Sequence, residues 1–123
     1  MTVTNRSAAR ATALAADLPG LQVLAWEDRA ALAGFHMLVN TTSLGMAGQP
    51  SLDLDLAAAP PGLVVADIVY VPLETPLLRD ASARGLPVVG GIGMLLHQAR
   101  AGFAAWFGVL PEIDAATERV VTA

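Results

Sequence analysis

The 123 residues are enough for about one ordinary domain, and 54% of them are hydrophobic while only 15% are charged. The formal net charge is −4, with seven arginines and no lysine, which argues against non-specific nucleic-acid binding and excludes a lysine base or Schiff base within these residues. The absence of cysteine excludes disulfides, thiol catalysis and thiolate metal sites.

Neither a membrane span nor a metal site is expected. The uncharged stretch that most resembles a span, residues 85–98, contains a proline and four glycines and is too short and too polar to cross a bilayer. No signal-peptide pattern is visible, so a soluble cytoplasmic protein is expected. His36 and His97 lie far apart, and neither has a second ligand at metal-site spacing. The high apolar content predicts an exposed surface that a missing domain or a second copy would cover.

Short runs typical of strands alternate with runs typical of helices. Asn5 or Ser7 is expected to cap the first helix, and Thr75 with Pro76 to open a later one. In chain order we predict a strand at 2–4, a helix at 7–17, a strand at 21–25, a short helix at 27–33, strands at 37–40 and 63–69, a helix at 74–84, a strand at 87–89, a helix from the glycines at 90–93 to about 107, and a last helix at 111–119.

This alternation predicts an α/β fold with a parallel sheet. The strands are apolar on both faces, so we expect helices to cover both sides of the sheet. Polar or glycine-rich turns follow four of the strands, at residues 5–6, 40–45, 67–70 and 90–93. The carboxyl ends of parallel strands form the edge at which open α/β sheets bind ligands, so the four turns are expected to build one site there.

Arg6 and Arg10 are the basic groups of the first turn. They stand four residues apart where a strand gives way to a helix, so both can converge on one anion together with the positive end of the helix. In a dinucleotide-binding fold, arginine after the second strand suits the 2′-phosphate of NADP rather than the ribose hydroxyl of NAD. Taken alone, the motif fits two solvated surface arginines equally well.

The other turns are weaker signals by themselves. The run from Asn40 to Met46 fits a ligand loop, although an ordinary Asn/Ser turn is the favoured interpretation. Asp67, at the end of an apolar strand, is more often a structural hydrogen-bonding group than a catalyst. Tyr70 either contacts ligand or packs.

The glycine-rich turn at 90–93 matches neither the Rossmann fingerprint nor the Walker loop. Met94 offers a soft apolar wall, and Gln98 lies one turn further on the same helix face. His97 points about 100° away from Gln98, so core packing is expected for it.

Together the segments resemble the shikimate dehydrogenase family, C-terminal NADP-binding domain. That family has Asn-Arg-Thr-x-x-Arg/Lys, Asn-Ala-Thr-x-x-Gly-Met, Asp-x-x-Tyr-x-Pro with Thr-Pro-Leu, Gly-x-x-Met-Leu-x-x-Gln-Ala and Trp-x-Gly-x-x-Pro, in that order. Each has its counterpart here, with Ser7 in place of the usual threonine, and the match covers residues 2 to about 112.

The resemblance implies a Rossmann-like, doubly wound and mostly parallel sheet that binds NADP. It implies an adenosine-2′-phosphate clamp of Asn5, Arg6, Ser7 and Arg10. It further implies cofactor contacts at Thr42, Ser43, Ile68, Gly91 and Met94, and shikimate or 3-dehydroshikimate contacts at Tyr70 and Gln98.

The resemblance also implies what residues 1–123 lack. The family's N-terminal substrate domain, with its Lys-Asp pair for proton transfer, has no counterpart, so no catalytic residue is expected in this chain. The first strand and its glycine-rich turn are lacking as well. In a doubly wound sheet that strand lies between the second and the fourth. We therefore expect either exposed strand edges with dimerisation or swapping, or part of a longer protein.

Three functions remain open. The first is the cofactor-binding half of an NADP-dependent shikimate dehydrogenase of aromatic amino-acid biosynthesis, or a quinate/shikimate paralogue. The second is a truncated, non-catalytic nucleotide-binding or assembly module. The third is an unrelated α/β domain whose turns are purely structural.

Overall fold

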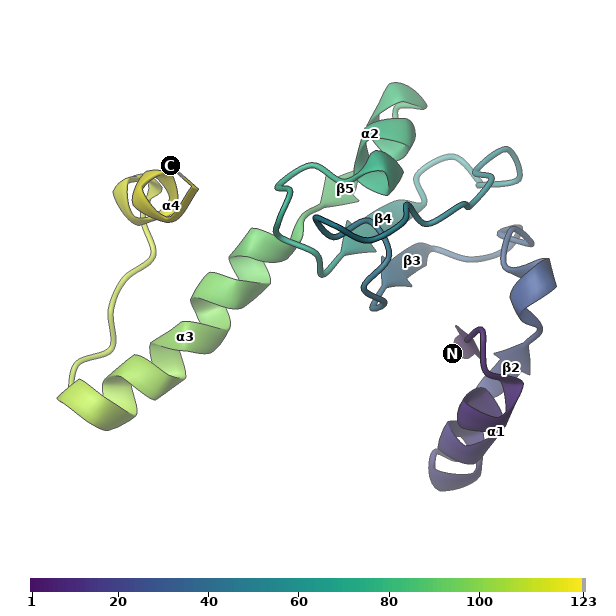
Figure 1. Cartoon of the computed structure of the whole chain (residues 1–123), viewed down its shortest axis with the longest axis horizontal. Coiled ribbons are helices and arrows are strands. Elements are labelled where there is room, and N and C mark those ends of the chain that lie inside the picture. Colours follow the sequence, from purple (N-terminus) through teal and green to yellow (C-terminus); the bar gives the residue numbers. More distant parts are fainter. Residues whose placement is uncertain (123) are drawn as a thin grey trace. The chain divides into compact units, whose positions relative to one another are not determined.

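The computed structural model describes residues 1–122, which divide into two compact units. One unit comprises Met1–Phe35 with Leu54–Pro60, and the other comprises His36–Asp53 with the chain from Pro61 onward. Figure 1 shows the elements in chain order. We describe each unit by itself.

The first unit is a βαβ arrangement. Strand β1 (Thr2–Thr4) leads through helix α1 (Ala8–Asp17) to strand β2 (Gln22–Leu24), and the two strands pair in parallel. Ser7 caps α1, because its side chain accepts a hydrogen bond from the Arg10 N–H. Gly20, with φ of +86°, makes the turn after the helix.

The predicted helix at 27–33 is wrong. The structure has only a short 3-10 turn, η1 (Trp26–Asp28). The Arg29 guanidinium lies 4.9 Å from the Trp26 ring centroid, and its Nη1 donates to the Trp26 carbonyl oxygen over 3.0 Å. These contacts close one turn. So few residues form too few helical hydrogen bonds to offset the nucleation cost of a longer helix.

The second unit contains a three-stranded parallel sheet. Strands β3 (Met37–Asn40), β4 (Val64–Asp67) and β5 (Val88–Val89) are hydrogen-bonded in the order β3-β4-β5. Helix α2 (Pro76–Ala83) connects β4 to β5 and packs beside both of them (Figure 1). The core of this unit is formed by apolar side chains from β4, from the residues on either side of it and from α2, including Leu63, Val65, Val69, Leu77, Leu78 and Ala81.

Within the described residues of this unit, helices do not cover both sides of the sheet, contrary to expectation. Met37 and Val39, which share one face of β3, are exposed, and so are Val88 and Val89 of β5. Within residues 1–122 only α2 supplies extensive helix packing to this sheet. The predicted exposed apolar surface is therefore present.

The long helix α3 (Gly91–Phe107) follows β5, and its end at Phe107 agrees with the prediction. Its only buried residues are Gly91 and Leu96, both near the start. Further along, the rings of Phe103 and Phe107 contact each other at a tilt of 42°, with centroids 4.6 Å apart, and Trp106 is 80% exposed. Most of α3 thus presents apolar side chains that the described residues do not cover.

The last helix, α4 (Ala115–Thr122), begins later than the predicted 111. Asp114 Oδ1 accepts hydrogen bonds of 2.8 Å from both the backbone N–H and the hydroxyl of Thr117, as an N-cap residue does. Pro111 stays in the preceding loop, where its carbonyl oxygen accepts a 2.7 Å hydrogen bond from Arg100 Nε. The aspartate determines where the helix starts, not the proline.

The Asp114 cap predicts that α4 weakens in acid. The hydrogen bond from the Thr117 N–H, followed by that from its hydroxyl, lowers the pKa of Asp114. A lowered pKa stabilises the folded state above the carboxyl's ordinary range, and this contribution is lost as the pH falls through the lowered value. We expect the Thr117 amide resonance to follow that titration in NMR spectra. Asp114→Asn should abolish the pH dependence of the Thr117 resonance while keeping a capping oxygen. An unchanged titration in this variant would show that Asp114 is not the group that caps α4.

Among residues 1–122, no helix is both long enough and apolar enough to pass through a bilayer. Over the same residues, no group of three or more histidine or acidic side chains is placed to hold a metal ion.

Candidate functional site at the carboxyl edge of the β3-β4-β5 sheet

Three of the four predicted turns lie together at one edge of the second unit. They follow Asn40 at the end of β3, Asp67 at the end of β4, and Val89 at the end of β5. Because the strands are parallel and neighbouring, their carboxyl ends meet at this edge. The fourth turn, at Asn5 and Arg6, follows β1 in the first unit.

Asn40 organises the loop after β3. Its side chain is 3% exposed, and all its hydrogen-bonding capacity is used. The Oδ1 accepts from the N–H of Thr42 at 3.0 Å and from its hydroxyl at 2.8 Å. The Nδ2 donates to the Leu44 carbonyl oxygen at 3.1 Å and to Asp67 Oδ1 at 3.0 Å. The Thr42 hydroxyl in turn accepts from the Leu44 N–H at 3.1 Å, so the loop is held from within.

Asp67 joins the ends of β3 and β4 to the next loop. It is 2% exposed, and its Oδ1 accepts from the Val69 N–H at 3.0 Å as well as from Asn40. Its Oδ2 accepts a short hydrogen bond of 2.7 Å from the Thr75 hydroxyl. A buried carboxylate needs such donors, because burying an unpaired charge is very unfavourable. The structure therefore supports the prediction that Asp67 is a structural hydrogen-bonding group.

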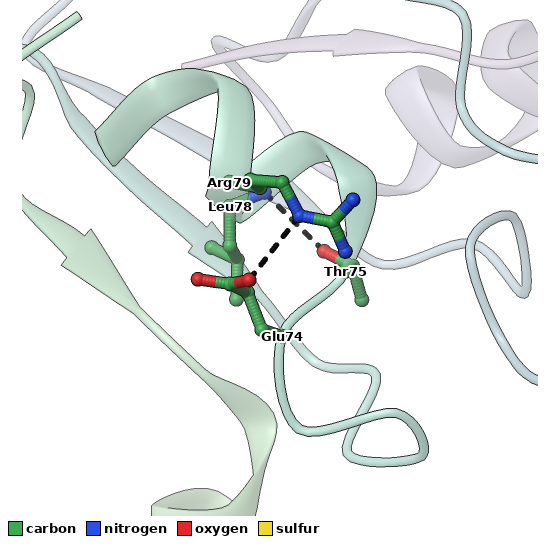
Figure 2. Close-up of polar contacts among 4 residues, drawn as sticks. All are labelled: Glu74, Thr75, Leu78 and Arg79. Carbon is green, nitrogen blue, oxygen red and sulfur yellow. Dashed lines mark hydrogen bonds and ion pairs between the residues drawn. The ribbon is translucent and has the colours of Figure 1, made fainter. Parts of the chain in front are cut away.

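Thr75 begins helix α2, as the sequence predicts. Its fully buried hydroxyl accepts from the Leu78 N–H at 3.3 Å, and Pro76 occupies the first helical turn. Figure 2 shows this cap beside the ion pair of Arg79 Nε with Glu74 Oε2, 3.2 Å apart. Both charged side chains are more than 60% exposed, so the ion pair contributes little to stability and the buried cap is the stronger determinant of where α2 starts.

The start of α3 touches the turn after β4. A Cβ built on Gly91 would overlap the Ile68 carbonyl oxygen and lie 2.7 Å from that of Val69. Only a glycine permits this close approach of two backbones. The N-terminus of α3 and the turn at 68–69 are thereby held against one another.

The predicted cofactor and substrate residues of this unit differ in accessibility. Gly91 is buried, Thr42 and Ile68 are half-buried, and the side chains of Ser43, Tyr70, Met94 and Gln98 are exposed. Their elements meet at one edge, but the proposed contacts remain predictions. His97 is exposed, so the expectation of core packing is wrong. Helix α3 has only two buried residues, which leaves no core at that position.

The hydrogen bonds of Asn40 and Thr75 to Asp67 were not predicted from the sequence. The available signal was the position of two polar residues, Asn40 and Asp67, at the ends of apolar strands, since such residues require partners. Those partners are distant in the chain, 27 residues away for Asn40, so the pairing itself needed the fold.

The first unit presents the basic groups. Asn5 Oδ1 accepts from the Ser7 N–H at 2.8 Å and Ser7 caps α1, so both polar side chains order the turn. Arg6 and Arg10 are exposed, and neither makes an ion pair or a side-chain hydrogen bond with any residue that the structure describes. Two unpaired guanidinium groups beside a helix N-terminus suit a phosphate monoester, the group that distinguishes NADP from NAD. The donor chemistry at this turn therefore fits the cofactor that the resemblance implies.

The strand order and these loops identify the class of fold. The strand order of a doubly wound sheet is 3-2-1-4-5-6. The two-stranded sheet β2-β1 corresponds to strands 3-2 of that order, and the three-stranded sheet β3-β4-β5 corresponds to strands 4-5-6. The described residues thus form a Rossmann-like fragment without the first strand, as the sequence predicts.

Comparison with known proteins gives the family. The sequence model of the shikimate 5′-dehydrogenase C-terminal domain matches residues 91–121. The chain is 64% identical over 124 residues to the shikimate dehydrogenase (NADP(+)) of Acidiphilium cryptum, covering 100% of this chain and 45% of that protein. The chain thus spans less than half the length of the curated relatives it matches.

Solved structures agree. The shikimate 5-dehydrogenase of Thermus thermophilus, in complex with NADP(H) and shikimate, matches 98% of this chain and 44% of its own, with a TM-score of 0.78 and 34% identity. A quinate dehydrogenase from Corynebacterium glutamicum in complex with NAD matches 99% of this chain and 46% of its own, with a TM-score of 0.84 and 27% identity. The chain belongs to the shikimate dehydrogenase family and corresponds to its C-terminal part.

Proposed function

We propose that these residues are the cofactor-binding part of an NADP-dependent shikimate dehydrogenase. That enzyme reduces 3-dehydroshikimate to shikimate with NADPH, and it oxidises shikimate with NADP in the reverse direction. The observation that carries the proposal is the 64% identity with a shikimate dehydrogenase (NADP(+)) along the whole chain. Arg6 and Arg10, which have no ion-pair partner among residues 1–122 and lie beside the start of α1, support the choice of NADP.

Cofactor contacts are proposed for each unit by itself. Asn5, Arg6, Ser7 and Arg10 bind the adenosine 2′-phosphate through their amide, guanidinium and hydroxyl groups. The second unit offers Thr42 and Ser43 to the middle of the cofactor, and Ile68, Gly91 and Met94 to its nicotinamide end. When bound, NADP accepts or supplies the hydride.

Tyr70 and Gln98 are proposed to contact the substrate from the cofactor side. Both are exposed, and a phenol and an amide are suitable partners for a polyol because each donates and accepts hydrogen bonds. Asp67 is unsuited to proton transfer, because it is buried and both its oxygens already accept hydrogen bonds. With no lysine in the sequence, the proton-transfer groups are proposed to lie elsewhere in the natural polypeptide.

The apolar surface is proposed to be covered by further chain or by a second copy. The exposed Phe103, Trp106, Phe107 and Leu110 support this, since an apolar patch of this kind marks an interaction surface. The division into a single partial NADP-binding domain and the cytoplasmic location remain predictions from the sequence.

The test is a measurement on the natural polypeptide that contains these residues. Its intact mass is compared with the 12.7 kDa of residues 1–123, and its oxidation of shikimate is followed with NADP and with NAD. A chain of about the relatives' length that oxidises shikimate with NADP supports the proposal. A 12.7 kDa chain without turnover favours the non-catalytic module instead.

A second candidate is a quinate dehydrogenase that uses NAD. The similarity to the quinate dehydrogenase of Corynebacterium glutamicum, with a TM-score of 0.84, favours it, whereas the arginine pair opposes it. Quinate oxidation with NAD that exceeds shikimate oxidation with NADP would select this candidate.

A further inference from the structure

Asp67 stands at the junction of the loops that carry the proposed site. Through Asn40 its carboxylate reaches the loop of Thr42 and Leu44, and through the Val69 N–H it reaches the turn between Ile68 and Tyr70. The start of α3 rests on that same turn, because Gly91 lies directly against the backbone of Ile68.

The third contact of Asp67 fixes the far end of the β4–α2 loop. Thr75 donates its hydroxyl proton to Asp67 Oδ2 and accepts from the Leu78 N–H, so one hydroxyl links the carboxylate to the first turn of α2. The loop from 68 to 74 is therefore tied at both ends to a single side chain. The three groups that donate to the Asp67 carboxylate are neutral. Directed hydrogen bonds therefore hold the carboxylate in place, and they restrict the positions of the groups that donate them.

We propose that Asp67 is a positioning residue of the dehydrogenase site, whose buried carboxylate sets the loop of Thr42 through Asn40 and the turn before Tyr70 through the Val69 N–H. Since it is 2% exposed, Asp67 acts through these neighbours and does not itself meet cofactor or substrate. The inference rests on the proposed function, because the positioned side chains are those assigned to the middle and nicotinamide end of the cofactor and to the substrate.

Loss of the Asp67 contacts should change substrate recognition and NADP affinity to different extents, whereas a general loss of stability would change both. The loops that Asp67 holds carry the residues proposed for the substrate and for the middle and nicotinamide end of the cofactor, whereas the arginines proposed for the 2′-phosphate belong to the first unit. The charge-assisted contacts of those arginines are proposed to supply most of the affinity for NADP, and they do not depend on Asp67. Loosening the loops should therefore weaken substrate recognition and slow turnover, while affinity for NADP changes little.

The experiment compares Asp67→Asn with Asp80→Asn in the natural polypeptide. Asp80 is an exposed residue of α2, so the control makes the same chemical change away from the loops. For Asp67→Asn we expect the KM for shikimate to rise about tenfold, because hydrogen bonds to a charged acceptor become weaker neutral ones. The dissociation constant for NADP should stay within about twofold, and both values should be unchanged in Asp80→Asn.

A merely structural role predicts another result. If the KM for shikimate is unchanged and kcat falls only in proportion to the folded fraction measured by circular dichroism, the positioning role of Asp67 is overturned.

A second measurement needs no turnover and therefore distinguishes this inference from the proposed function. Amide hydrogen exchange of Thr42 and Leu44 should become about tenfold faster in Asp67→Asn, since both amides donate within the loop that Asn40 anchors. The Val65 amide, which donates to the Pro87 carbonyl oxygen at 2.8 Å within the sheet, serves as the internal control. If the wild type does not oxidise shikimate, the proposed function fails. The exchange rates alone then test whether Asp67 positions the loop of Thr42, and unchanged exchange at Thr42 and Leu44 overturns the inference.

Two further variants apply if Asp67→Asn does not fold. Thr75→Val removes the hydroxyl that donates to Asp67 with little change of shape, and Thr75→Ser retains it. We expect a raised KM for shikimate in Thr75→Val and a KM near that of the wild type in Thr75→Ser. Equal KM values in the two variants would count against the proposal.

Discussion

Replacing Gly91 by alanine is expected to destabilise the protein by about 3 kcal/mol, at the upper end of the usual cost of overpacking. The new Cβ would overlap the Ile68 carbonyl oxygen and lie 2.5 Å from the Ile68 carbonyl carbon. These are backbone atoms at the end of β4, so no side-chain rotation relieves the clash. Either α3 shifts away from the turn or the turn itself distorts, and both changes disrupt the candidate site. Urea unfolding of the natural polypeptide measures the effect.

Gly102→Ala is the matched control on the same helix. A Cβ at Gly102 meets no atom within 4 Å, and the residue lies inside α3. Alanine has the higher helix propensity, so this variant should be more stable than the wild type by about 1 kcal/mol. Equal stabilities for the two alanine variants would show that α3 does not approach the β4 turn as closely as described.

Removing both arginines of the first turn is expected to change cofactor choice. In Arg6→Ala/Arg10→Ala we expect NADP affinity to fall about 100-fold, since each guanidinium is proposed to make charge-assisted hydrogen bonds to the 2′-phosphate. Affinity for NAD, which lacks that phosphate, should stay within about twofold. Titration calorimetry with both nucleotides measures the two constants.

Arg79→Ala is the control for the arginine variants. Arg79 is an exposed arginine of α2 that pairs with Glu74 in the preceding loop, so its removal lowers the positive charge of the chain without changing the first turn. We expect wild-type affinity for both nucleotides. If the double variant lost NADP and NAD affinity equally, the two arginines would not be specific for the 2′-phosphate.

Local signals were sufficient for most elements. Thr75 with Pro76 predicted the start of α2, and both residues stand there in the structure. Helix α3 ends at Phe107, as predicted, and Gly108 follows it with φ of +71°, the left-handed conformation that glycine adopts readily. The class of fold followed from strands and helices alternating at short intervals.

The errors arose where local patterns compete with specific contacts. Pro111 is a good first residue for a helix, yet Asp114 accepts the hydrogen bond of the Thr117 N–H, and α4 starts four residues later, at Ala115. The apolar strands indicated a sheet covered on both faces, but hydrophobicity identifies a surface that favours burial without identifying what buries it. Helix α3 likewise carries an apolar sequence and stays mostly exposed.

The sequence by itself determined the parallel α/β class and the order of the motifs, because strand and helix periodicity, caps and glycine-rich turns are properties of neighbouring residues. The family was indicated separately, by the resemblance of those motifs to the shikimate dehydrogenases. The tertiary structure alone decided that Asn40, Asp67 and Thr75 form one buried network, and that Gly91 rests on the backbone of Ile68. These contacts join residues far apart in the chain. Each depends on the strands being paired in register and on the turns being brought to one edge, which no local pattern encodes.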